Sequence, residues 1–213
     1  MRELRTQGYE SPRPDVAAHV PTDARVILEL GCSTGVLGES IKRRQDAFIV
    51  GVEPDHSYAA EAATRLDRVA NCTAEEFLAA RPAEAPFDCL VCADVLEHLV
   101  DPWSVLRQAT GMLRPDGTAV ISLPNVLYWR GLLRVIARRT WPRDDEGIFD
   151  RTHLRWFTGS DAILLARQAT LEVIDLEPRF WDEGWRLSAH RLLYRTPFGP
   201  FLAAQYIVTA RRR

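Results

Sequence analysis

The chain has 213 residues, of which 46% are apolar and 26% charged, and its formal net charge at pH 7 is −2. This balance is typical of a soluble globular protein and gives no general attraction to nucleic acid or anionic lipid. No apolar run is long enough to span a membrane, and no basic segment followed by an apolar one opens the chain. We therefore expect one cytoplasmic domain over residues 1–213 that acts without nucleic acid or a membrane.

Short apolar runs alternate with helical patterns along most of the chain. The apolar runs predict strands at 26–30, 47–53, 68–71, 87–93 and 117–123, with two later candidates at 171–177 and 202–210. Helical patterns occupy 36–44, 55–66, 74–80 and 101–113, and Pro115-Asp116-Gly117 predicts a turn before the fifth strand. Such alternation indicates an α/β fold in which a parallel sheet carries helices on both faces.

The four cysteines predict core residues rather than a disulfide or a metal site. Cys89 and Cys92 form a C-x-x-C, but both lie inside a predicted strand. Side chains alternate between the two faces of a strand, so an offset of three places this pair on opposite sides of the sheet. No cluster of histidine and acidic residues shows a convincing metal spacing in the sequence, and we expect no metal.

The first predicted strand and the turn after it are the most informative part of the chain. Residues 26–35 read V-I-L-E-L-G-C-S-T-G, an apolar run that ends in a glycine-containing turn. Gly31 and Gly35 allow the backbone to turn tightly and to approach a ligand closely. Glu53 ends the second apolar run, 22 positions after Gly31, where an acid can accept hydrogen bonds from ribose hydroxyls. The pattern predicts a cofactor that contains a nucleoside.

The residues of this turn distinguish between nucleoside cofactors. A dinucleotide-binding G-x-G-x-x-G would need glycine at positions 33 and 36, where the chain has Ser33 and Val36, and no phosphate-binding P-loop occurs. The run Glu29-Leu30-Gly31-Cys32-Ser33-Thr34-Gly35 instead resembles motif I of class I S-adenosylmethionine-dependent methyltransferases. This resemblance implies a Rossmann-like, doubly wound, mostly parallel seven-stranded sheet, with the seventh strand antiparallel, and S-adenosyl-L-methionine as cofactor.

The resemblance also implies which residues form the cofactor site, at the carboxyl ends of four strands. The expected residues are Glu29, Gly31, Cys32, Ser33, Gly35, Glu53, Pro54, Thr73, Ala74 and Asp94, with Tyr9 from an N-terminal lid over about 1–22. The alternative for this N-terminal segment is that it packs on a helix. Thr73 stands where the family usually carries an acid for the adenine amino group, and it offers a hydrogen-bond acceptor without charge. The alternative for Glu29 and Glu53 is a pair of solvated acids at strand ends.

Three further segments resemble a narrower group, the small methyltransferases found with glycosyltransferases in polysaccharide and natural-product pathways. These segments are P-R-P-D-V near the start, S-L-P-N at 122–125 and G-I-F-D-R-T-H-L-R-W-F-T at 147–158. The resemblance implies O-methylation of a hydroxyl on a sugar or a glycosylated small molecule. An N-methyltransferase and a cofactor-binding partner protein that does not catalyse remain the alternatives.

We place the acceptor chemistry in an insertion over about 124–158, which is rich in aromatic and charged residues. The expected substrate-binding residues are His98, Asn125, Trp129, Arg130, Arg151 and Trp156. Glu97 and His98 could also simply begin a helix. A neutral histidine can take the proton of a hydroxyl at neutral pH, so we predict His153 as general base, with Asp150 fixing its tautomer. The alternative is that His153 only joins the insertion to the body of the protein.

Two other features have open interpretations. Arg130, Arg134 and Arg138 share one helical face, which is either solvated or binds an anionic acceptor. The segment 179–200, which carries Trp181, Trp185, His190 and Tyr194, could line the acceptor pocket or form a subunit contact, and the latter would allow a homodimer.

Overall fold

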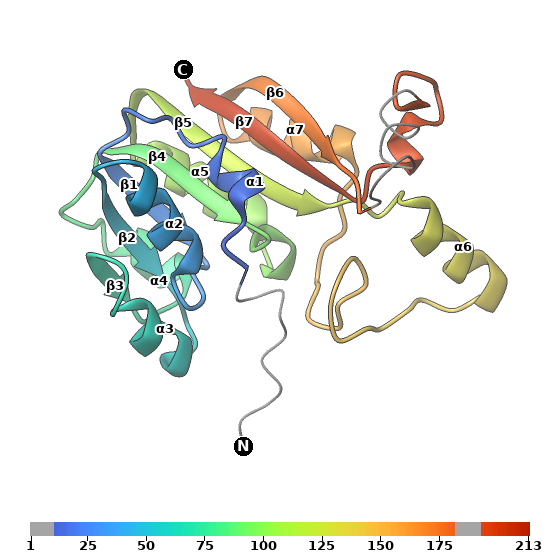
Figure 1. Cartoon of the computed structure of the whole chain (residues 1–213), viewed down its shortest axis with the longest axis horizontal. Helices are drawn as coiled ribbons and strands as arrows, with labels where there is room; N and C mark the ends of the chain where they lie inside the picture. Colours follow the sequence, from blue (N-terminus) through green and yellow to red (C-terminus); the bar gives the residue numbers. More distant parts are fainter. Residues whose placement is uncertain (1–10, 182–192) are drawn as a thin grey trace.

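The protein folds around one seven-stranded sheet, seen in the computed structural model, which describes residues 11–181 and 193–213 (Figure 1). The strand order is β3-β2-β1-β4-β5-β7-β6. Neighbouring strands are parallel except for β7, which runs antiparallel to both β5 and β6. The strands are Val26–Leu30 (β1), Phe48–Val52 (β2), Arg68–Ala70 (β3), Phe87–Ala93 (β4), Leu113–Pro124 (β5), Leu171–Arg179 (β6) and Gln205–Arg212 (β7).

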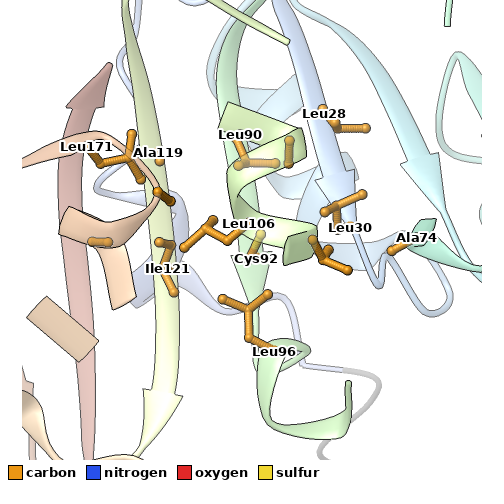
Figure 2. Packing of buried hydrophobic residues seen from close by; sticks show 14 of the residues in the cluster. Leu28, Leu30, Ala74, Leu90, Cys92, Leu96, Leu106, Ala119, Ile121 and Leu171 are labelled. Atoms are coloured by element: carbon orange, nitrogen blue, oxygen red, sulfur yellow. The ribbon is translucent and has the colours of Figure 1, made fainter. Parts of the chain in front are cut away.

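Helices cover both faces of this sheet. They are Pro14–Ala17 (α1), Val36–Arg44 (α2), His56–Ala62 (α3), Ala74–Ala79 (α4), Pro102–Gly111 (α5), Trp129–Arg138 (α6) and Gly159–Gln168 (α7), with short 3-10 turns at Leu96–His98 (η2) and Gly199–Phe201 (η3). Buried residues of α4, α5 and α7 form one core with the sheet, part of which Figure 2 shows. Those of α1, α2 and α3 form a second core. The predicted doubly wound α/β fold is confirmed.

The two strand cysteines lie as their spacing predicts. Cys92 belongs to the core beneath α5, whereas Cys89 belongs to the core beneath α2. All four cysteines are free thiols, and burial raises the pKa of Cys89 and Cys92. The pair therefore serves as apolar packing on opposite faces of β4.

The predicted turn at residues 115–117 is wrong in one respect, because β5 continues through it. Phe87 pairs with Leu113 and Cys89 with Thr118, so the strand carries a bulge between these pairs. Asp116 adopts a positive φ of 62° in the bulge. Turn-forming residues here distort the ladder without ending it, because pairing with β4 resumes immediately afterwards.

The described part of the predicted N-terminal lid runs from Arg13, which contacts Asp94 after β4, into α1, which packs on the body of the protein. Val16, Ala17 and Val20 are buried in the core that contains α2. Tyr9 lies outside the described residues, as do Trp185 and His190. Helix α6 projects from the body of the protein in Figure 1, and among its residues only Gly131 is buried. Within the described part of the chain, no helix combines the length and the apolar character that crossing a bilayer requires.

Candidate active site

The turn after β1 is held in a conformation that suits glycine. Gly31 and Gly35 have φ angles of 69° and 80°, and Ser33 between them has a φ of 47°. A Cβ atom on Gly31 would lie 2.6 Å from Cγ2 of Val95, in the turn after β4. The turns after β1 and β4 therefore pack directly against each other, and both backbone angle and space require glycine at position 31.

Glu53 is clamped to this turn from the end of β2. Its Oε2 accepts a hydrogen bond from the Ser33 N–H at 3.0 Å, and its Oε1 accepts one from the Asp55 N–H at 2.9 Å. The side chain is 8% exposed, and burial raises its pKa. The alternative of a solvated acid is wrong for Glu53. Each carboxylate oxygen accepts more than one hydrogen bond, so Glu53 can still bind the hydroxyls of a ribose.

The side chains of Glu29 and Cys32 are buried inside the protein, beside the turn after β1. Glu29 is 2% exposed and accepts a hydrogen bond from the Gly38 N–H, and burial raises its pKa to about 8. The Cys32 thiol points at Gly51 of β2, where an added Cβ would lie 2.6 Å from its Sγ. We expected both residues in contact with the cofactor. The structure directs both side chains into the protein, so they shape the turn through packing.

Thr73 serves first as the cap of helix α4. Its hydroxyl accepts a hydrogen bond from the Glu76 N–H at 3.2 Å and donates to Glu76 Oε2 at 3.1 Å. Ala74 is buried in the core, and the carbonyl oxygen of Pro54 accepts a hydrogen bond from Asn71 Nδ2 at 3.0 Å. These contacts place the three residues at the ends of β2 and β3, and their contact with the cofactor stays a prediction.

Asp94 directly follows β4, has a positive φ of 55° and is tied to the N-terminal segment. Its carboxylate accepts hydrogen bonds from Arg13, Gln205 and, at 2.9 Å, the Ser122 hydroxyl. Arg13 also donates to the Ser122 hydroxyl at 3.0 Å. Arg13 was not among the expected site residues, although it stands inside the P-R-P-D-V segment, because nothing in the sequence pairs it with a strand end 81 residues away.

The insertion docks on η2, immediately after Asp94. The Leu154 and Arg155 N–H groups donate to the carbonyl oxygen of Glu97 at 2.9 and 3.0 Å. This contact brings the rings of His98 and His153 edge to face, with centroids 4.6 Å apart. The Glu97 side chain is 1% exposed, and its pKa is raised well above the ordinary value by burial and by the Asp94 charge. The sequence suggested only a helix start for Glu97.

Asp150 acts on a different histidine from the predicted one. Nδ1 of His153 lies 3.0 Å from the carbonyl oxygen of Ile148, which fixes the ring. The Asp150 carboxylate accepts hydrogen bonds from the N–H and the hydroxyl of Thr152, at 2.8 and 2.7 Å. The Thr152 hydroxyl in turn lies 3.0 Å from Nδ1 of His98. The predicted pairing of Asp150 with the His153 ring is therefore wrong, and Asp150 orients His98 through Thr152.

Comparison with known proteins shows the family to which the chain belongs. A family profile described as a methyltransferase domain matches residues 2–176. The chain belongs to the class I S-adenosylmethionine-dependent methyltransferases. The predicted cofactor, S-adenosylmethionine, is the one this family uses.

Individual relatives agree with this family assignment. A ubiquinone biosynthesis O-methyltransferase of Aeromonas salmonicida is 35% identical over 158 residues, 70% of this chain and 64% of the relative. The chain spans about half the length of most curated relatives it matches. A methyltransferase structure from Archaeoglobus fulgidus shares the fold, with a TM-score of 0.68, 16% identity and 97% coverage of both chains. An N1-methyltransferase from Burkholderia thailandensis, solved with S-adenosylhomocysteine, has a TM-score of 0.60, 20% identity and coverage of 94% of this chain and 77% of its own.

One predicted acceptor contact of the methyltransferase is wrong. Asn125 is completely buried, and its Nδ2 donates to the carbonyl oxygens of Pro200 and Ala203, both at 2.7 Å. Its Oδ1 accepts from the Leu127 N–H at 3.2 Å. The amide therefore joins the end of β5 to the η3 turn and is closed off from an acceptor.

The arginine row on α6 is partly paired within the chain. Arg134 makes a two-pronged ion pair with Asp144, with N–O distances of 2.6 and 2.8 Å. The Arg130 guanidinium lies 5.3 Å from the centre of the Trp129 ring, and Arg151 pairs with Asp145 on the surface. Arg134 thus holds α6 to the loop that follows it within the insertion, which weakens the interpretation of the row as an anion-binding face.

Trp156 lines a hollow that is separate from the strand ends. The hollow has a volume of about 570 Å³ and lies between α5 and α7. Its lining residues are Trp103, Arg155, Trp156, Phe157, Asp161, Leu164, Leu165 and Gln168. Neither Glu53 nor the two histidines belong to this lining, so Trp156 marks a second surface, formed by the end of the insertion with α5 and α7.

Proposed function

We propose that this methyltransferase moves the methyl group of S-adenosylmethionine to a hydroxyl of a small-molecule acceptor. The observation that carries the proposal is the position of two histidines directly behind the cofactor turns. His98 follows Asp94 in η2, and His153 packs against it from the insertion. A hydroxyl nucleophile must lose a proton during attack, whereas an amine can attack in its neutral form.

The residues around the turn after β1 suit a cofactor without phosphates. Glu53 keeps hydrogen-bonding capacity for ribose hydroxyls while it fixes the turn through Ser33. When bound, S-adenosylmethionine supplies a methyl group on a cationic sulfur, and this methyl is open to in-line displacement. The contact between Arg13 and Asp94 supports the predicted N-terminal lid, because it ties the segment before α1 to the end of β4.

The histidines are suited to take the hydroxyl proton. Nδ1 of His153 bonds to a carbonyl oxygen, so in the neutral ring the lone pair lies on Nε2. Burial, together with the neighbouring His153, lowers the pKa of His98, which favours the neutral form of this ring. We propose His153 and His98 as the acceptor-side bases, with Asp150 and Thr152 positioning His98.

The kind of molecule that carries the methylated hydroxyl is a second, more specific step of the proposal. The curated relatives are O-methyltransferases of ubiquinone biosynthesis, which favours a hydroxyl acceptor. The segments at 122–125 and 147–158 favour a sugar or a glycosylated metabolite. We propose the hydroxyl acceptor on both grounds, and the sugar class on the resemblance of these two segments.

The first experiment is calorimetric titration of the purified protein with S-adenosylmethionine, with S-adenosylhomocysteine and with NAD. We expect binding of the two sulfur compounds and none of NAD, and we expect Glu53→Ala to weaken that binding. Turnover with panels of sugar hydroxyls, phenols and amines, read as S-adenosylhomocysteine formed and product mass, then assigns the acceptor. Methylation of amines alone would refute the O-methyl proposal, and binding without transfer across all three panels would favour a non-catalytic role.

A further inference from the structure

Two exposed tryptophans border the hollow between α5 and α7. Trp103 of α5 is 37% exposed, and Trp156, near the end of the insertion, is 40% exposed, although an indole ring gains much stability from burial. Leu164 of α7 belongs to the same lining and is 53% exposed. Single exposed apolar side chains are ordinary, but a group of them around a hollow of about 570 Å³ is typical of a binding surface.

Neighbouring groups hold both indole rings in place. The centre of the Trp103 ring lies 6.5 Å from that of the buried Phe157 ring and 6.0 Å from the guanidinium carbon of Arg155. The Trp156 ring packs edge to face on Trp141, with ring centroids 5.0 Å apart. Because fixed rings lose little conformational freedom when a ligand packs on them, this arrangement suits binding.

Three polar side chains of the lining keep hydrogen-bonding capacity for a ligand. Arg155 donates to two backbone carbonyl oxygens, which leaves further N–H groups of its guanidinium available. Asp161 accepts hydrogen bonds from the Thr158 N–H and hydroxyl with Oδ2, at 2.9 and 2.7 Å. These bonds fix the carboxylate, and its Oδ1 makes no hydrogen bond within residues 11–181 and 193–213. The Gln168 amide offers both a donor and an acceptor.

This combination of rings and polar groups indicates the class of ligand. A sugar ring carries C–H groups on its faces and hydroxyl groups around its edge. The C–H groups can pack on the negatively polarised faces of the indole rings, while the polar side chains bind the hydroxyls. A purely apolar ligand would instead take water from Arg155, Asp161 and Gln168 without replacing its hydrogen bonds. The Asp161 carboxylate disfavours an anionic ligand such as a phosphate, because like charges repel.

One short segment of the insertion contributes to both the hollow and the proposed active site. Arg155 follows His153 by two positions, so their Cα atoms are at most about 7 Å apart. The Leu154 and Arg155 N–H groups both bond to the carbonyl oxygen of Glu97, which fixes the backbone between the two sites. A substrate longer than one sugar ring therefore has the length to reach the histidines and the hollow together.

We propose that the hollow between α5 and α7 binds a neutral sugar ring that belongs to the same acceptor as the hydroxyl at the histidines. The place of this ring in the reaction rests on the proposed function, whereas sugar binding in the hollow is measured without it. The ring in the hollow does not react. It selects glycosylated acceptors over single sugars and small phenols through binding.

The test is saturation-transfer NMR of the whole protein, titrated with neutral mono- and disaccharides of glucose, galactose, mannose, rhamnose and xylose. We expect transfer to the ring C–H protons of at least one sugar. Trp103→Ala and Trp156→Ala should each weaken its binding by about 10-fold, because each removes one aromatic face. Trp156→Phe keeps such a face and should retain most of the affinity. Thermal unfolding of each variant checks that the fold is retained.

An exposed aromatic ring outside the hollow provides the control. Phe48, at the start of β2, is 43% exposed and is not part of the lining, so Phe48→Ala should leave sugar binding unchanged. Absence of transfer to every sugar, or equal affinity in the wild type and in Trp156→Ala, would overturn the proposal. Sedimentation gives a further check. A dimer that Trp156→Ala dissociates would show that a second copy of the chain occupies this surface, which would also overturn the proposal.

The role of the hollow in substrate selection has its own readout once an acceptor is found. Trp103→Ala should raise KM for a glycosylated acceptor by about 10-fold and change its kcat little, because the ring in the hollow contributes equally to ground-state and transition-state binding. KM for a single-sugar acceptor should change much less. Equal changes for both acceptors would overturn the link between the hollow and the reaction. Failure of S-adenosylmethionine binding would instead refute the proposed function, and the sugar titration would still stand.

Discussion

Replacing Glu29 by glutamine should remove a strong pH dependence of folding stability. The carboxyl group is buried under the turn after β1, and burial raises its pKa from 4.5 to about 8. The folded state therefore binds more protons than the unfolded chain between these two pH values. Stability from this group is complete below pH 4.5 and is lost as the pH rises toward 8. The whole shift corresponds to about 5 kcal/mol, of which roughly 3 kcal/mol is lost by pH 7.

The assay is urea unfolding of the wild type and of Glu29→Gln at pH 5, 6, 7 and 8. Glutamine keeps the size of the side chain and cannot ionise, so the curve of the variant should fall less steeply. The difference between the two proteins should change by about 2.5 kcal/mol between pH 5 and 7 in favour of the variant. Glu75→Gln, at an exposed position of α4, is the control and should run parallel to the wild type. Parallel curves for Glu29→Gln would show that this acid ionises normally and is not buried as described.

Three further variants test the cofactor turn and the insertion. Glu53→Gln should weaken S-adenosylmethionine binding by about 10- to 100-fold in calorimetry, because it removes a charged acceptor from the Ser33 and Asp55 N–H groups; unchanged affinity would exclude this acid from the site. Gly31→Ala places a Cβ 2.6 Å from Val95 and should lower the thermal midpoint, with partial recovery in the double variant with Val95→Ala. Asn125→Ala should destabilise the protein by about 2 to 4 kcal/mol in urea, because two buried carbonyl groups lose their donor. Loss of turnover without loss of stability in Asn125→Ala would instead indicate that Asn125 contacts the acceptor.

Local sequence patterns determined the elements and the cofactor end of the protein. Strand β1 and helix α2 begin and end at the predicted residues, because an apolar run followed by glycine and then an amphipathic stretch leaves few alternatives. The position of Glu53 at the end of β2 follows from the same pattern, since parallel strands place their carboxyl ends on one edge of the sheet. These features depend on spacing within a few residues or within one strand–helix–strand unit.

Tertiary contacts decided the acceptor side. Asp150 and His153 are three positions apart in the chain, and the sequence paired them. Asp150 instead bonds to Thr152, and docking of the insertion on η2 brings the Thr152 hydroxyl to His98. Glu97 looked like an ordinary helix residue until packing of the insertion enclosed it beside both histidines. Arg13 and Asp94 meet across 81 positions. Sequence patterns report the direction of a side chain relative to its own element, whereas the partner of a buried polar group depends on which distant segments pack against it.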